Sequence, residues 1–461
     1  MTNGASKFVW DKLQALRSSQ GSRAVLARGA TGAMAANVAG AGVAYGAQVL
    51  LARLMGSEQY GIYAYVVAWL MALQFVGMFG VPQTIVRFGA AYAARDELGL
   101  LRGLLRWADR TALGVSMAVG AVMLTVTLLL PEPVLAGITP YPGELRLALM
   151  IGAGSMPIAV LKLVKVQTLR AFGGGALSVT LERLVRPTTM IVLALLALPL
   201  TGLPLRGSVT VGLYLASFAT VGVLAVAIVR RRQPANLPAA APQRDVRAWL
   251  DMALPSIFIS GMSTLLGSTD RVMIGMLRGT EEAGVYTASV NTAMLVSFGL
   301  TALNAVLAPM VSSLHSTGKH HELQRILTLA AWTLFAWTAL GSTGLLVFGP
   351  WILSLFGKAF LIGTFPLYIM VMAQIVNSSA GSVGLLLNMT GHQKFTSVVL
   401  AAAAALNVLL NFVLIPRFGM NGAAAATGTA MVAWNAAMLA VVHRKLHLNP
   451  TIFRLRFGAR R

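Results

Sequence analysis

Six basic residues lie inside or beside stretches of the sequence that are otherwise apolar. They are Arg87, Lys162, Lys165, Arg183, Arg186 and Arg271. A charge in such surroundings is costly, so these residues are candidates for a function. Lys162 and Lys165 are three residues apart, which places both on one face of a helix. The spacing predicts a cationic wall that could receive an anionic group, unless both side chains extend to a membrane surface.

Two acidic residues in the same stretches allow two interpretations each. Glu182 is a candidate coupling group for protons, or it forms an ion pair with Arg186 four residues later. Asp270 and Arg271 are adjacent, so their side chains point about 100° apart on a helix and do not simply neutralise each other. This pair either contacts a substrate or makes a structural ion pair across a helix bundle.

Uncharged polar residues add a second kind of candidate. Asn407 and Asn411 either line a cavity and bind hydroxyl groups or hydrogen-bond between helices. The chain has no cysteine, which excludes thiol chemistry and cysteine metal sites. It also has no glycine-rich loop ending in Lys-Ser or Lys-Thr, so direct use of ATP is not expected. We expect no catalytic residue, no metal and no cofactor.

The composition indicates which elements must position these residues. The 461 residues are 57% hydrophobic and 11% charged, with a mean hydropathy of +0.74. Soluble domains carry about 25% charged residues, so an ordinary soluble enzyme, a disordered chain and a secreted disulfide scaffold are excluded. The net charge of +22 would suggest nucleic acid in a soluble protein. In a polytopic membrane protein it reflects basic loops that stay in the cytoplasm, and we expect no nucleic-acid partner.

Apolar runs long enough to cross a bilayer recur twelve times, and each predicts a membrane-spanning helix. They lie near 30–52, 61–83, 111–131, 145–169, 177–199, 208–229, 250–277, 284–308, 326–348, 361–387, 395–415 and 420–442. The predicted organisation is an N-terminal cytoplasmic or interfacial segment (1–29), an N-lobe of six spans (30–229), a cytoplasmic linker (230–249), a C-lobe of six spans (250–442) and a basic cytoplasmic tail (443–461).

The basic residues fit this map when both termini face the cytoplasm. Of the 36 Lys and Arg residues, 29 then fall on inner segments, six on outer segments and one, Arg271, within a span. Such an asymmetry is what the positive-inside rule requires. Two segments, 7–17 and 87–110, combine a basic with an apolar stripe and are predicted to lie on the membrane surface. The segment 230–247 is rich in Pro, Ala and Arg, which predicts a flexible connector.

An internal repeat relates the two halves. Residues 56–64 read GSEQYGIYA and residues 279–287 read GTEEAGVYT, in a shared Gly-x-Glu-x-x-Gly-x-Tyr pattern at a constant offset. Both copies fall in the short outer turn between the first two spans of their half. Repeated halves are typical of transporters, in which the substrate pathway lies between them.

These residues resemble the oligosaccharide flippases of bacterial polysaccharide synthesis. The first half carries LLARLMGSEQYGIYA (50–64) and VPQTIVRF (81–88), and the second begins with DRVMIG (270–275). LNMTGHQK (387–394), LIPRFG (414–419) and GAAAAT (422–427) are similar to the C-terminal signature of that family. The resemblance implies the all-α fold of the multidrug/oligosaccharidyl-lipid/polysaccharide (MOP) exporter superfamily, with about twelve spans in two six-helix lobes arranged in a V shape.

The resemblance also implies a function. A flippase of this family turns undecaprenyl-diphosphate-linked oligosaccharide from the inner to the outer leaflet of the bacterial inner membrane by alternating access. Membrane lipids, a polysaccharide polymerase and chain-length proteins are the implied partners, and O-antigen, capsule or exopolysaccharide is the implied product. A sugar hydroxyl taken into hydrocarbon without a partner costs about 4–8 kcal/mol, so the carrier needs a wet cavity with cations for the diphosphate.

Two other functions are open at this point. A multidrug or cation antiporter of the same superfamily would share the fold, but it would need acidic residues in its cavity, and the buried set is mainly basic. A membrane polysaccharide polymerase or glycosyltransferase would need a large outer loop with catalytic groups. The longest outer linker, 131–145, carries only Glu132 and Glu144 as acidic residues, which does not favour an enzyme.

Overall fold

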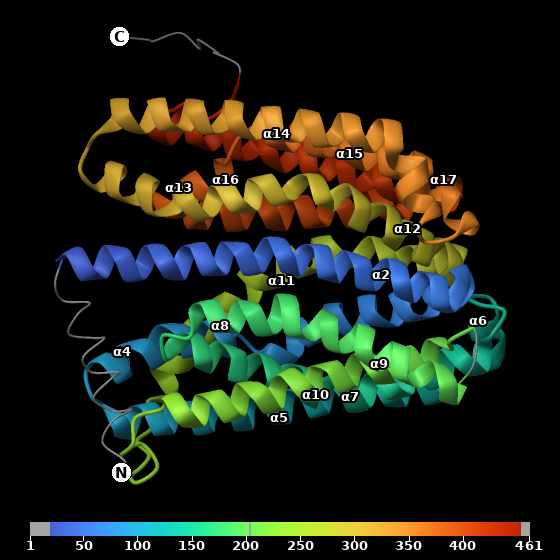
Figure 1. The fold of residues 1–461 in the computed structure, drawn as a ribbon, viewed down its shortest axis with the longest axis horizontal. Coiled ribbons are helices and arrows are strands. Elements are labelled where there is room, and N and C mark those ends of the chain that lie inside the picture. The colour runs from blue at the N-terminus through green and yellow to red at the C-terminus, as the bar shows by residue number, and fades with distance from the viewer. Residues whose placement is uncertain (1–18, 202–203, 453–461) are drawn as a thin grey trace. The chain divides into compact units, whose positions relative to one another are not determined.

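A computed structural model describes residues 19–201 and 204–452 (Figure 1). In these residues the chain is all-helical, without a β-strand, and nine helices are long and apolar enough to cross a membrane. This confirms the predicted all-α, polytopic class. The predicted segment 7–17 and the end of the predicted basic tail lie outside the described residues.

Two of the long helices bend at a glycine and contain two predicted spans each. α2 (Ser19–Met78) has non-helical torsion angles at Gly56, and α17 (Gln393–Leu446) has them at Gly419. α11 (Val246–Arg278), which contains Pro255, covers the seventh predicted span. With these three helices taken into account, the predicted spans fall mainly on helices of the structure. The tenth, 361–387, is interrupted between the helix that ends at Ser379 and the one that begins at Val383, where Gly381 has φ 73°.

The chain forms two compact units. Unit 1 comprises the described residues of Met1–Leu51, Leu70–Pro131 and Gly143–Ser260, and unit 2 comprises those of Ala52–Trp69, Glu132–Pro142 and Gly261–Arg461. α2 and α11 contribute to both. The other helices of unit 1 are α3 (Val81–Thr84), η1 (Ile85–Gly89), α4 (Ala90–Ala94), α5 (Leu98–Leu129), α7 (Pro142–Ala171), α8 (Gly175–Thr180), η2 (Leu181–Val185), α9 (Arg186–Thr201) and α10 (Gly207–Arg232). Those of unit 2 are α17 and α6 (Glu132–Ala136), α12 (Thr280–Ala293), η3 (Met294–Ser297), α13 (Phe298–Ser316), α14 (His320–Ser354), η4 (Lys358–Gly363), α15 (Thr364–Ser379) and α16 (Val383–Met389).

In unit 1, α7 packs between α5 and α10, and the three helices run side by side (Figure 1). Asp109 of α5 contacts Lys165 of α7, and Gly120 lies against the carbonyl of Ala153, so these two helices are antiparallel. The other face of α7 packs with α10, where Lys162 lies next to Gly222. Small residues in these contacts let the helices approach closely, as is usual in membranes.

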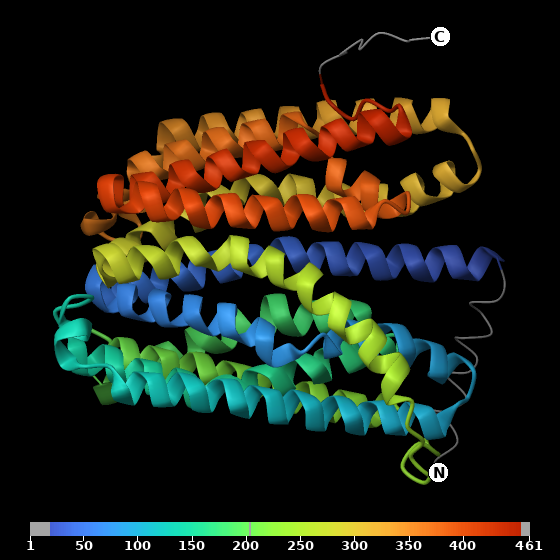
Figure 2. The same ribbon diagram turned by 180° about the vertical axis from the view of Figure 1, so that it is seen from behind.

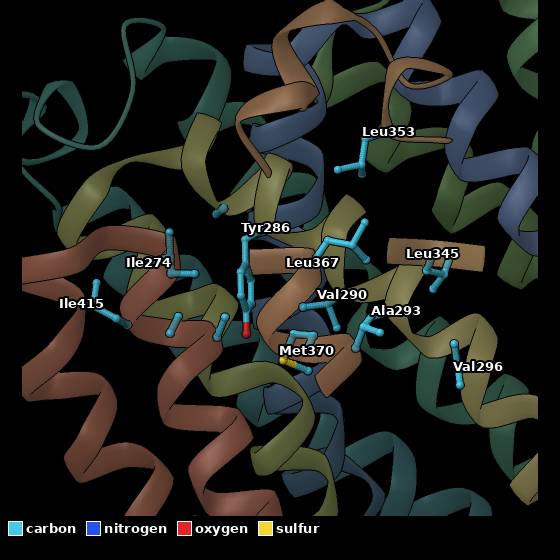
Figure 3. Close-up of a cluster of buried hydrophobic side chains, with 14 residues drawn as sticks. Ile274, Tyr286, Val290, Ala293, Val296, Leu345, Leu353, Leu367, Met370 and Ile415 are labelled. Carbon is cyan, nitrogen blue, oxygen red and sulfur yellow. The ribbon is translucent and has the colours of Figure 1, made fainter. Parts of the chain in front are cut away.

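In unit 2, α14, α15 and α17 lie side by side (Figure 2). The buried side chains at the centre of the unit surround Tyr286 of α12 and include Ile274, Leu367, Met370 and Ile415 (Figure 3). Tyr286 is fully buried and is the tyrosine of the second repeat motif. The second repeat motif therefore supplies part of the core of this unit.

The two copies of the repeat contact each other within unit 2. Ser57 Oγ donates a hydrogen bond of 2.6 Å to Glu281 Oε1. A Cβ on Gly284 would lie 2.7 Å from Gly61 Cα, and one on Gly61 would meet the carbonyl oxygen of Thr280. We call this arrangement the repeat contact. The middle glycine of each motif has no room for a side chain because the other copy lies against its backbone.

The first glycine of each motif has a backbone that other residues rarely adopt. Gly56 has φ 75° and ψ 172°, and Gly279, its counterpart, has φ 101° and ψ 163°. This region is almost confined to glycine and costs other residues about 1–3 kcal/mol. The sequence repeat is thus also a repeat of backbone conformation, and each copy turns the chain from one span into the next.

We expect Gly56→Ala to lower the free energy of unfolding by about 1–3 kcal/mol, because alanine must adopt the strained torsion angles of that turn. Thermal unfolding of the purified protein in detergent would measure the loss. Gly46→Ala is the matched control, since Gly46 lies in the same helix and a Cβ there would meet nothing within 4 Å. Equal stability of the two variants would contradict the role given to Gly56.

Two segments differ from their predicted form. Residues 87–110 are not one surface helix, because the chain leaves α4 at Arg95, passes through Asp96 with φ 57° and begins α5 at Leu98.

The connector 230–247 packs on the start of α5: Gln243 N donates to the Gly99 carbonyl at 2.9 Å, Arg102 donates to the Ala240 carbonyl, and Leu237 is buried. The composition of this segment predicted a flexible connector. The segment is ordered by the surface of α5 around Gly99, and that surface cannot be recognised from the sequence of the connector itself.

Candidate functional site

The strongest candidate site in unit 1 centres on Lys162 of α7. Its Nζ lies 2.8 Å from Glu182 Oε1, and its side chain is 5% exposed against 22% for that of Glu182. Nζ also lies 4.3 Å from the centre of the Phe218 ring of α10. A buried ammonium needs such partners because an unpaired charge in an apolar interior is costly.

Arg186 completes this cluster from the start of α9. Its guanidinium lies 5.7 Å from the centre of the Tyr214 ring and 5.8 Å from that of Phe218, both on α10. Its Nε is 3.5 Å from the backbone oxygen of Glu182. In the described residues the Glu182 carboxylate pairs with Lys162 and not with Arg186, so the predicted i,i+4 ion pair is wrong. The carboxylate of Glu182 pairs with the more deeply buried Lys162. Arg186 is stabilised by the ring faces of Tyr214 and Phe218 instead.

Lys165 lies in a separate ion pair one helical turn away. Its Nζ is 2.6 Å from Asp109 Oδ2 of α5, and both side chains are partly exposed. Lys162 and Lys165 line the same groove of unit 1, as their spacing predicts, but each ammonium already faces a carboxylate. Within the cluster of Lys162, Glu182 and Arg186, the charges leave one positive charge in excess, which Arg186 carries.

The remaining basic candidates of unit 1 lie apart from this cluster. Arg87 is exposed, with its Nη1 3.2 Å from the sulfur of Met252. Arg183 is exposed, and its backbone lies against Gly40 of α2. The structure therefore gathers Lys162, Glu182 and Arg186 and leaves these two arginines elsewhere.

Unit 2 holds a second buried polar cluster, centred on Asp270 of α11. Tyr286 donates a 2.7 Å hydrogen bond to Asp270 Oδ2, and Thr427 Oγ1 lies 3.4 Å from the same oxygen. The backbone N–H of Arg271 donates to Asp270 Oδ1 at 2.9 Å. Asp270 is 3% exposed, so these donors replace the water that a carboxylate would otherwise bind.

The two asparagines extend this cluster. Asn407 Nδ2 donates to Thr427 Oγ1 at 3.0 Å, and Asn411 Nδ2 donates to Asn407 Oδ1 at 3.1 Å. Both asparagines are buried. The Arg271 side chain reaches Asn291, with Nη2 3.5 Å from Asn291 Oδ1. The bond of Asn407 joins the two segments of α17 on either side of Gly419, whereas that of Asn411 lies within one segment.

Removing the Tyr286 hydroxyl should destabilise the protein measurably. We expect Tyr286→Phe to lower the free energy of unfolding by about 1–3 kcal/mol, because Asp270 would lose its shortest hydrogen bond in a buried site. Thermal unfolding in detergent would test this. Tyr368→Phe is the control, since Tyr368 packs against the same apolar cluster and should lose less than about 0.5 kcal/mol. A Tyr286→Phe protein as stable as the control would contradict the importance of this bond.

Sequence reasoning missed several members of both clusters. Asp109 falls in the segment 87–110, which the sequence predicts to lie on the membrane surface, although it is an acidic residue beside a long apolar run. Tyr214 and Phe218 are four residues apart in an apolar helix and carry no charge that would single them out. Tyr286 was noted only as a repeat residue, and its pairing with Asp270 needed the fold. A search for acidic residues that could neutralise each buried lysine would have found Asp109.

Comparison with known proteins identifies the family and the fold of the chain. A sequence model of the family described as polysaccharide biosynthesis protein matches residues 26–315. Among solved structures, the lipid II flippase MurJ in an inward closed conformation is 14% identical, with a TM-score of 0.69 over 88% of this chain and 86% of that one. An inward-facing multidrug resistance MATE family transporter of the MOP superfamily is 13% identical, with a TM-score of 0.70 over 88% and 94%.

A third similar structure is a MOP superfamily transporter from Pyrococcus furiosus, described as having a binding pocket of reverse polarity. It is 13% identical, with a TM-score of 0.60 over 90% of this chain and 93% of that one. A search of curated protein sequences gives no match. At these identities the solved structures establish the shared fold.

Proposed function

Because this chain belongs to the polysaccharide biosynthesis protein family of the MOP superfamily, a family of flippase-type membrane transporters, we propose that it flips undecaprenyl-diphosphate-linked oligosaccharide. The substrate would pass from the inner to the outer leaflet of the bacterial inner membrane. In this proposal both chain termini face the cytoplasm, where most basic residues lie. A polysaccharide polymerase and chain-length proteins would use the product on the outer side.

One observation carries the choice of substrate: the buried charges of unit 1 leave an excess of positive charge. Glu182 neutralises Lys162, and Arg186 remains without a carboxylate among the described residues. A diphosphate would complete the charge balance of this cluster, and its oxygens would accept hydrogen bonds from the guanidinium. Lys165, which lines the same groove, is the further cation that we propose to assist.

The membrane potential is the proposed energy source. Moving one net negative charge toward the positive side of the membrane yields about 2.3 kcal/mol per 100 mV. In this scheme Glu182 and Asp270 are the candidate coupling groups if ions contribute as well. Collapse of the potential in vesicles at a constant pH gradient should slow flipping, and an unchanged rate would reject this energy source.

The decisive experiment is deletion of the gene, followed by assay of lipid-linked oligosaccharide on each face of the inner membrane. We expect the substrate to accumulate in the inner leaflet and surface polysaccharide to be lost. Normal surface polysaccharide without inner-leaflet accumulation, in a strain that lacks a redundant carrier, would reject the proposed function. Reconstitution into liposomes with a fluorescent prenyl-diphosphate saccharide tests the same activity directly.

A multidrug antiporter is the second candidate, supported by the similarity to the MATE family transporter. Such a protein binds cationic compounds and would need a free carboxylate. The two carboxylates that face the groove and cluster of unit 1, Asp109 and Glu182, both pair with lysines, which favours an anionic substrate. Proton-driven uptake of a cationic dye into vesicles, with no flipping of the saccharide lipid, would decide for the antiporter.

A further inference from the structure

A groove in the surface of unit 1 lies beside the cluster of Lys162 and has a volume of about 670 Å³. Its walls come from α5, α7 and α10. Gly222 has no side chain to fill the bottom of the groove. A Cβ at this position would lie 3.5 Å from the alkyl chain of Lys162. The volume lies within the range of about 300–1,000 Å³ that is typical of pockets for small ligands.

The groove has a charged end and an apolar end. α5 runs antiparallel to α7 and α10. At each end of the groove, an N-terminal part of α5 therefore faces C-terminal parts of α7 and α10, or the reverse. At one end lie the charged lining residues, Asp109, Arg110, Lys165 and Arg230. Toward the other end lie the apolar residues Leu113, Ile158, Ala219 and Val223. Val223 is 68% exposed, so this apolar wall is open and not part of the packed core.

Two cations at the charged end have no partner of opposite sign among residues 19–201 and 204–452. Lys165 is neutralised by Asp109, and Lys162 by Glu182. Arg110 and Arg230 are exposed, and within the part of the chain that the structure describes no carboxylate lies within 4.0 Å of either guanidinium. The groove thus combines an open hydrocarbon-lined trough with two free guanidinium groups at one end.

We propose that this groove binds an anionic membrane phospholipid. One acyl chain lies along Leu113, Ile158 and Val223, and the phosphodiester accepts hydrogen bonds from Arg110 and Arg230. Guanidinium groups bind phosphate oxygens in a bidentate manner, and basic pockets between membrane helices are known to bind lipid headgroups.

The position of the cations favours a resident phospholipid over the transported substrate. Arg230 is in the last turn of α10 and is followed by Arg231 and Arg232, a run that is typical of the cytoplasmic headgroup level. A headgroup bound there stays at the surface. The buried ammonium of Lys162, farther along the groove, is already covered by Glu182 and Phe218. The proposal goes beyond the transport function and does not depend on the identity of the glycan.

Native mass spectrometry of the full-length protein tests the proposal. The probes are dioleoyl-phosphatidylglycerol, which is anionic, and dioleoyl-phosphatidylcholine, which has the same chains without net charge. We expect at least tenfold more retained phosphatidylglycerol than phosphatidylcholine. The double variant Arg110→Gln with Arg230→Gln should lose this preference. The corresponding double change to lysine should keep most of it, because the charges remain.

Filling the groove gives an independent test. Ala227→Trp places a large side chain in the groove and should reduce retention of phosphatidylglycerol at least tenfold. Leu224→Trp is the matched control, because Leu224 is exposed on the same helix but does not line the groove, and it should retain the lipid as the unmodified protein does. If Ala227→Trp misfolds, as judged by size-exclusion chromatography, Ala227→Leu takes its place.

Three results would overturn the proposal. The first is unchanged retention in the filled variant, and the second is equal retention of the two phospholipids by the unmodified protein. The third is displacement of phosphatidylglycerol by an equimolar amount of undecaprenyl diphosphate, which would make the transported lipid the occupant. Loss of saccharide flipping with intact phosphatidylglycerol retention would instead count against the proposed function alone.

Discussion

A cross-link between Ser57→Cys and Glu281→Cys should stop transport almost completely. In the structure the two native side chains are joined by a 2.6 Å hydrogen bond in the repeat contact. The chain has no cysteine of its own, so a short bifunctional thiol reagent can react only with the two introduced residues. In the proposed alternating-access cycle the two turns that carry the repeat have to separate, and a covalent bridge would prevent that step. We expect flipping in liposomes to fall more than tenfold after cross-linking.

The controls separate arrest from damage. Each single cysteine variant, treated with the same reagent, should retain transport, because no bridge can form. A cleavable reagent should restore the double variant when the bridge is reduced. If the bridged protein, verified by mass spectrometry, flips its substrate at the normal rate, the repeat contact does not open during transport and this role for it is wrong.

The second large effect concerns the buried ion pair of unit 1. Lys162→Met leaves the Glu182 carboxylate without its partner, and breaking a buried pair in this way costs about 3–5 kcal/mol. We expect a loss near the lower limit, because the Glu182 side chain is 22% exposed and keeps some contact with water. Thermal unfolding in detergent would measure it. Flipping should be abolished in the same variant.

The double variant Lys162→Met with Glu182→Leu separates stability from transport. Apolar side chains of similar size can replace a buried ion pair without loss of stability, so this variant should unfold within about 1 kcal/mol of the unmodified protein. We still expect it not to flip the substrate, because Lys162 and Glu182 are gone and only Arg186 remains of the charged cluster. Recovery of transport together with stability would show that the pair is only structural.

The spans and the repeat could be predicted because each depends only on residues that are close together in the sequence. A run of apolar residues is sufficient to predict a membrane helix, and a motif that recurs at a fixed offset identifies duplicated halves. Gly56 and Gly279 then take similar torsion angles because the same residue type meets the same turn in each half.

The partners of the buried charges could not be predicted, because they depend on which helices pack together. Lys162 is twenty residues from Glu182, and Lys165 is fifty-six residues from Asp109. Spacing within one helix favoured Arg186 for Glu182, and it gave no reason to choose Asp109 for Lys165. The same limit applies to the pairing of Asp270 with Tyr286, which only the packing of α12 against α11 establishes.

The repeat contact also limits how the gene could be divided. Unit 2 takes residues 52–69 and 132–142 from the N-terminal half of the chain, and Gly61 lies directly on the backbone at Thr280. A fragment that begins at residue 261 would therefore lack part of its own interior. Two separately expressed polypeptides should restore the carrier only when they meet in the same membrane, and a mutation at Gly61 would have to be compensated on the other polypeptide.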